Sequence, residues 1–88
     1  MTAMNEFDLQ AWERELGAWQ RRLERHPPGE LRSLLHALGR QVGLLRALYN
    51  EGEALDGDRT QDRLRRGFAE LRAIYDREAG GDSATTPA

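Results

Sequence analysis

Residues 31–49 read LRSLLHALGRQVGLLRALY, and this stretch decides the fold. Placed on a helix at about 100° per residue, its apolar side chains cover roughly half of the circumference and are interrupted only by Gln41. These side chains are Leu31, Leu34, Leu35, Ala37, Leu38, Val42, Leu44, Leu45, Leu48 and Tyr49. A helix with so wide an apolar face buries it only between two neighbours. The stretch therefore predicts a central helix at about residues 28–50.

The segments on either side carry narrower apolar stripes. Residues 6–26 and residues 58–79 both repeat apolar side chains in alternating steps of three and four, as the seam of a coiled coil does. The first seam consists of Leu9, Trp12, Leu16, Trp19 and Leu23, and the second of Leu64, Phe68, Leu71 and Tyr75. One wide stripe between two narrow ones predicts that the middle helix packs against both others.

Capping chemistry fixes the expected helix boundaries. Asn5 with Asp8 can cap the first helix, and Asp58 with Gln61 resembles a capping box that opens the third. Pro28 suits the first position of the second helix, because proline is tolerated where a helix begins.

Short connections make consecutive helices antiparallel, so we expect an all-α, up-down-up three-helix bundle, formed by a helical hairpin and a third helix. Its single domain would occupy residues 6–79, with a flexible N-terminus at 1–5 and a disordered polar tail at 80–88. In this arrangement charges of opposite sign meet between the first and third helices. At one end these are Glu6 and Asp8 with Arg63, Arg65 and Arg66, and at the other Arg21, Arg22 and Arg25 with Asp76 and Glu78.

The composition argues against several classes of site and partner. The chain has no Cys and no Lys, and all thirteen basic side chains are Arg, which excludes disulfides, thiolate zinc sites and Schiff-base chemistry. This usage is typical of GC-rich coding sequences, so we expect a bacterial source. A net charge of −2 argues against nucleic acid as a partner. No apolar run approaches the ~20 residues of a membrane span, so we expect a cytoplasmic protein without membrane contact.

Catalytic templates find no match in this sequence. Ser33 and His36 are spaced to meet on one helical face, but no carboxylate is placed to orient the histidine. Arg32 and Arg40 occupy the positions around His36 where a metal site would place ligands. We therefore expect no enzyme activity, no cofactor and no metal.

Several residues are candidates for partner binding. Two tryptophans in a thin bundle serve either the core or a binding hot spot. Helical glycines one turn apart either allow a partner backbone to approach or reflect composition alone. The candidate partner-binding residues are Trp12, Trp19, Gly39, Gly43, Leu44 and Leu48.

The size of the domain points to association. About 70 ordered residues each lose ~1.5 kcal/mol of conformational freedom, which burial in so small a core barely offsets. We therefore expect the chain to bind another protein or itself, as a homodimer or heteromer. The predicted function is a non-catalytic helical adaptor, regulator or assembly factor of the chaperone type, which docks partner helices through its apolar seams. The alternative is a nucleic-acid-binding transcriptional regulator that uses the arginines at its helix ends.

Overall fold

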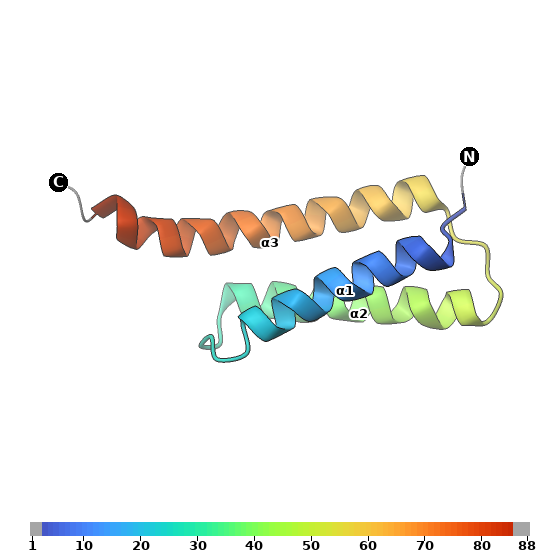
Figure 1. The fold of residues 1–88 in the computed structure, drawn as a ribbon, viewed down its shortest axis with the longest axis horizontal. Coiled ribbons are helices and arrows are strands. Elements are labelled where there is room, and N and C mark those ends of the chain that lie inside the picture. The colour runs from blue at the N-terminus through green and yellow to red at the C-terminus, as the bar shows by residue number, and fades with distance from the viewer. Residues whose placement is uncertain (1–2, 86–88) are drawn as a thin grey trace.

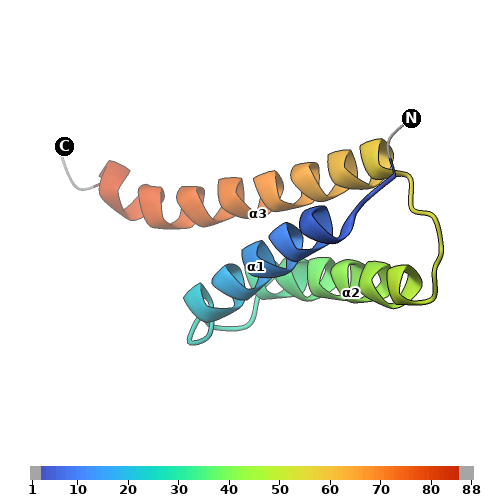
Figure 2. The same ribbon diagram turned by 45° about the vertical axis from the view of Figure 1, so that its right-hand side comes forward.

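The part of the chain that the structure describes folds into three helices. The computed structural model describes the backbone of residues 3–85 and the side chains of residues 3–78. Helix α1 spans Glu6–Arg22, α2 spans Glu30–Asn50 and α3 spans Gly57–Thr85. Figure 1 shows α2 running back along α1 and α3 returning along the pair, and Figure 2 shows the same order from a second direction. The predicted all-α class is confirmed, since every element of the described backbone is a helix.

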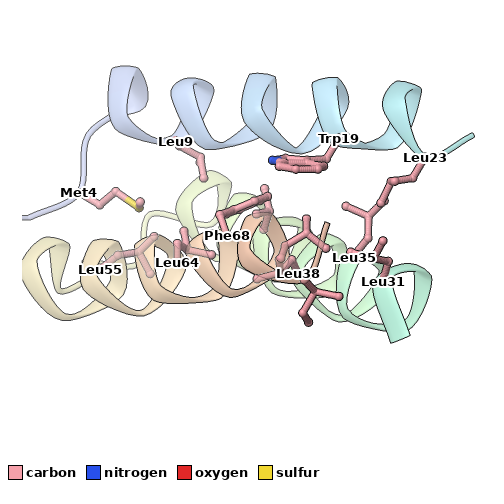
Figure 3. Close-up of a cluster of buried hydrophobic side chains, with 13 residues drawn as sticks. Met4, Leu9, Trp19, Leu23, Leu31, Leu35, Leu38, Leu55, Leu64 and Phe68 are labelled. Carbon is pink, nitrogen blue, oxygen red and sulfur yellow. The ribbon is translucent and has the colours of Figure 1, made fainter. Parts of the chain in front are cut away.

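Helix α2 lies at the centre, with α1 and α3 both packed against it. The helices contribute apolar side chains to one continuous core, and Figure 3 shows Leu9, Trp19 and Leu23 pointing from α1 toward the other two helices. The buried residues of α2 are Leu31, Leu35, Leu38 and Val42. They pack with Met4, Leu9, Trp19, Leu23, Leu55, Leu64, Phe68, Leu71 and Ile74. The predicted position of the middle helix between two partners is confirmed.

The apolar face of α2 is covered over a narrower arc than we expected. Leu34, Leu45 and Leu48 are only half-buried, and Leu44 is 60% exposed. The expectation that the whole half-circumference is enclosed is therefore wrong at its edge. Leu34, Leu45 and Leu48 still pack against the core, so the large apolar side chains of the arc are exposed mainly at Leu44.

The start of α1 follows the sequence prediction. The backbone N–H of Asp8 donates to Oδ1 of Asn5 at 2.9 Å, and the N–H of Asn5 donates to the Asp8 carboxylate at 3.2 Å. The two bonds form a capping box, which satisfies two of the amides that a helix start leaves without partners.

The connection between α1 and α2 is longer than predicted. Helix α1 ends at Arg22, before the expected end near residue 26, and α2 begins at Glu30. Pro28 therefore lies in the connection, and its predicted place at the first helical position is wrong. The guanidinium of Arg32 donates to the His26 carbonyl at 2.7 Å and to the Leu23 carbonyl at 3.4 Å. One side chain of α2 thus bonds to backbone carbonyl groups of the connection that follows α1.

Helix α3 is capped two residues earlier than the sequence suggested. Oδ1 of Asp56 accepts from the backbone N–H of Arg59 at 3.1 Å, so Asp56 acts as the N-cap. The predicted capping box of Asp58 and Gln61 is wrong, because α3 already includes Asp58 and the Gln61 side chain bonds to α1.

The N-terminal segment is fixed to the connection between α2 and α3. Met4 is buried, its N–H donates to the Leu55 carbonyl at 3.1 Å, and Ala3 forms an isolated antiparallel bridge with Asp56. Within the N-terminus predicted to be flexible, residues 3–5 therefore contact the fold, and Met4 completes one end of the core. Residues 1–2 lie outside the described residues.

The C-terminal end of α3 also differs from the prediction. The helix continues to Thr85, past the expected end near residue 79. Gly80 and Gly81 lie inside it, because glycine costs ~1 kcal/mol in a helix but does not by itself stop one. The part of the predicted tail at 86–88 lies outside the described residues.

Aromatic pairs join α1 to α3. Trp12 stacks on Phe68 with ring centroids 5.5 Å apart, and Trp19 meets Tyr75 edge-on at 5.4 Å. Such offset and edge-to-face pairs contribute beyond the area they bury. Large side chains, more than close backbone approach, therefore connect the two outer helices.

Candidate docking surface

Helix α2 carries two seams of coiled-coil spacing, and one of them faces outward. The inner seam faces α1 and α3 and consists of Leu31, Leu35, Leu38, Val42, Leu45 and Tyr49. The outer seam follows steps of three and four along the uncovered edge and consists of Leu34, Ala37, Gln41, Leu44 and Leu48. On a helical wheel the centres of the two seams lie roughly 90° apart.

The outer seam is exposed at Ala37 and Leu44 and partly covered elsewhere, because Leu34 and Leu48 also pack against the protein's own core. Leu44 is 60% exposed, Ala37 is exposed, and Leu34, Gln41 and Leu48 are half-buried. A spacing of three and four residues lets a second helix lay its side chains between these. The seam is therefore shaped to receive a helix.

The tryptophans predicted as partner-binding residues lie against the protein's own helices. Trp19 is 3% exposed, and its indole N–H donates to Glu15 at 2.9 Å. Trp12 is half-buried, and its indole N–H donates to Oε1 of Gln61 at 3.1 Å. Both indoles are used to hold α1 on α3, as the core-packing alternative expected. Of the predicted partner-binding residues, the structure brings Leu44 and Leu48 together on the outer seam.

The glycines of α2 lie away from the outer seam. A Cβ added at Gly39 would meet Leu16 of α1 at 3.7 Å, an ordinary contact, and one at Gly43 would meet nothing within 4 Å. The close approach occurs instead on α3, where a Cβ at Gly67 would lie 2.5 Å from Cδ2 of Leu38. Gly67 was not among the predicted partner-binding residues, and it allows α3 to approach α2.

An ion-pair cluster closes the α1 side of α2. Arg46 donates to the Glu6 and Glu13 carboxylates, with a shortest distance of 2.7 Å to each. The hydrogen bonds from Arg46 hold the pKa of both carboxyl groups below the ordinary value, and the two carboxylates raise the Arg46 pKa further above its already high value. The predicted pairing of Glu6 with arginines of the third helix is replaced by this pairing within the hairpin.

The arginines at the end of α1 serve a similar internal role. The Arg22 guanidinium lies 4.9 Å from the Trp19 ring centroid and 5.6 Å from that of Tyr75. Glu78, predicted to meet the α1 arginines, lies 3.3 Å from Nε2 of His26 instead. Part of the positive charge at the C-terminal end of α1 therefore forms cation–π contacts with two aromatic rings.

Charge pairs also form along the surface of α3. Arg66 contacts Asp62 at 3.1 Å and Arg72 contacts Asp76 at 3.9 Å, both one turn apart on the helix surface. These exposed pairs contribute little to folding, because water and salt screen them.

The residues tested as a catalytic pair lie in an open groove between α1 and α2. Ser33 and His36 are both exposed there, beside Arg32 and Arg40. Among the described residues, no group of three His, Asp or Glu side chains is placed to hold a metal ion.

Comparison with family models, with curated proteins and with solved structures finds no match to this chain. Among the described residues, no helix has the length and apolar character needed to cross a membrane. The outer seam is therefore the feature on which a function can be argued.

Proposed function

We propose that this chain is a helical protein-protein interaction module that binds a partner helix along the outer seam of α2. In this role the three helices act as one up-down-up bundle, with α1 and α3 holding α2 from behind. The observation that carries the proposal is Leu44, an apolar side chain that is 60% exposed on the outer seam. A cytoplasmic location in a bacterium is part of the same proposal.

The energetics of burial support docking at this surface. Covering a leucine side chain contributes about 1.5–3 kcal/mol when the side chain starts fully exposed, and less when it starts half-covered. Leu44 offers most of this gain, because Leu34 and Leu48 are already partly covered by the core, and a partner helix that is already ordered would lose less conformational freedom on binding. Such a contact would also add to the stability of a small domain without disulfides.

The alternative, a nucleic-acid-binding regulator, has less support. Three arginines that would contribute to a basic surface are already engaged within the protein. Arg22 lies over two aromatic rings, Arg32 donates to backbone carbonyls, and Arg46 bridges two glutamates. An adaptor that uses an apolar seam needs none of these charges.

A photoreactive amino acid at position 44 tests the proposal in cells that produce the full chain. We expect irradiation to attach a protein to position 44, because the partner helix would lie directly over Leu44. The matched control is position 18, since Ala18 is an exposed helical residue of α1. Adducts of equal yield from both positions, or none from position 44, would overturn the proposed function.

A further inference from the structure

We propose that the open groove between α1 and α2 binds a small amphipathic anion, namely a linear aliphatic chain that ends in a single carboxylate. The groove is separate from the outer seam, and the inference does not depend on the proposed function. Its volume is about 770 Å³, and it follows α2 from Gly29 to Arg40. This volume lies within the range of about 300–1,000 Å³ that is usual for small-molecule sites.

The groove exists because one side chain is missing from a row of α2 that faces α1. Arg32, Gly39 and Arg46 follow one another at steps of seven residues, nearly two helical turns, and therefore lie on one face of the helix. The two arginines carry long side chains, whereas the glycine between them carries none. A Cβ added at Gly39 would already meet Leu16 of α1 at 3.7 Å, so the glycine keeps the space beside Leu16 open.

Contacts within the protein limit the groove at both ends. Past one end, Arg46 bonds to Glu13 of α1 at 2.7 Å. At the other end, Arg32 donates to the carbonyls of His26 and Leu23 in the connection between the helices. A groove with two closed ends suits a small molecule, because a docked helix would need an open surface over several turns.

The floor of the groove is aliphatic. Leu16, Leu23 and Leu35 line it, and none of the described residues that line it is Phe, Tyr or Trp. Leu23 and Leu35 are already buried, but Leu16 is only half-buried. An aliphatic chain laid over Leu16 would therefore remove apolar surface from water, which favours binding.

The rim that α2 contributes is positive, although the chain has a net charge of −2. His36 and Arg40 lie one turn apart on this rim, and Arg40 forms no ion pair with the described residues. Across the groove, Nε2 of Gln20 lies 4.0 Å from the place of a Cβ at Gly39. The guanidinium and the amide can both donate to one carboxylate. Because Glu24 also lines the groove, a head group with one negative charge is favoured over one with two.

Titration of the isotope-labelled full chain with octanoate tests the inference by nuclear magnetic resonance. We expect saturable shifts of the backbone amide signals around Gly39. Octanol keeps the aliphatic chain without the charge, and acetate keeps the carboxylate without the chain. Each should bind at least about 10-fold more weakly than octanoate, because each lacks half of the recognised chemistry. Equal affinity for octanoate and either fragment, or no shifts with octanoate, would overturn the inference.

A pair of arginine variants tests the head-group site. Arg40→Gln should raise the octanoate dissociation constant by about 5- to 10-fold, because a charge-assisted contact is lost. The matched control is Arg66→Gln, which removes an arginine whose side chain is 81% exposed on α3. The control should leave the constant unchanged. Equal losses in the two variants would show a general attraction of anions and overturn a site at Arg40.

A pair of glycine variants tests the place of the aliphatic chain. Gly39→Gln should weaken octanoate binding by at least about 10-fold, because the new side chain would occupy the space beside Leu16. Gly43→Gln makes the same change one turn further along α2, where a Cβ would meet nothing within 4 Å, and should bind octanoate normally. Circular dichroism checks that both variants remain folded, and the exposed Arg40→Gln carries the test if Gly39→Gln does not. Unchanged octanoate binding by a folded Gly39→Gln would overturn the inference.

Discussion

The two seams of α2 have the same spacing, yet the protein covers them to different extents. Four residues of the inner seam are buried in the core, whereas the outer seam, about a quarter-turn away, has no fully buried residue and is exposed at Ala37 and Leu44. Spacing in the sequence therefore shows where a helix is able to pack, while the number and position of neighbours decide where it does pack. A chain with two neighbours on one side of its central helix retains an apolar surface that another chain can cover.

The largest effect should separate leucines of the two seams. Leu38→Ala should lower the free energy of unfolding by about 2–5 kcal/mol, because Leu38 is 4% exposed and packs against Gly67 of α3. Leu44→Ala should change it by only about 0.5 kcal/mol, as expected of an exposed position. Urea unfolding of both variants, at concentrations low enough for a monomer, makes the measurement. Equal losses would mean that the two seams are not distinct in the monomer.

A second pair of variants replaces two glycines by alanine, one on an open face of α2 and one on α3 where it contacts α2. Gly43→Ala should stabilise the protein by about 0.5–1 kcal/mol, because alanine favours a helix and its Cβ meets nothing within 4 Å. Gly67→Ala should be less stable than Gly43→Ala by about 1–3 kcal/mol, because its Cβ displaces the buried Leu38 side chain. Thermal unfolding of the two variants gives the difference. A more stable Gly67→Ala would show that the contact between α2 and α3 is looser than described.

The smallest effect should come from the ion pairs that border the inner seam. The Glu6 and Glu13 pKa values lie below the ordinary carboxyl value because Arg46 bonds to both groups. This contribution to stability is present above pH 4.5, the ordinary value, and is lost as the pH falls through the lowered values. Arg46→Gln should therefore lower the melting temperature at pH 7, and its difference from the unchanged protein should shrink as the pH falls below 4.5. A difference that does not change with pH would assign the loss to packing of the arginine stem.

The helical class and the place of the middle helix were predictable because both follow from the periodicity of apolar residues. The Asn5–Asp8 cap was predictable because capping is a local property of a few side chains. The end of α1 was not, since it depends on Arg32 reaching back from another helix to the His26 carbonyl. The start of α3 was predicted two residues too late, because Asp56 and Asp58 are both suitable caps and the structure uses Asp56. Gln61 could not complete the predicted capping box, since its side chain accepts a hydrogen bond from Trp12 of α1.

The candidate surface was predictable only in part. Leu44 and Leu48 lie on the wide apolar arc that predicted two neighbours for the middle helix. The width of the arc does not show which part of it those neighbours leave exposed. Dividing it into two heptad-like seams would have shown that Leu34, Ala37 and Gln41 belong with them. The role of Gly67 could not be foreseen, because close approach depends on how α3 lies over Leu38.

The bond from the Met4 amide to the Leu55 carbonyl joins the start of the chain to the connection that precedes α3. Its donor and acceptor meet only when both ends of the α1–α2 hairpin and the beginning of α3 are in place. Unlike an amide within a helix, this one cannot be protected by a helix that forms alone. Its rate of hydrogen-deuterium exchange would therefore follow the docking of all three helices, which makes one backbone position a reporter of cooperative folding.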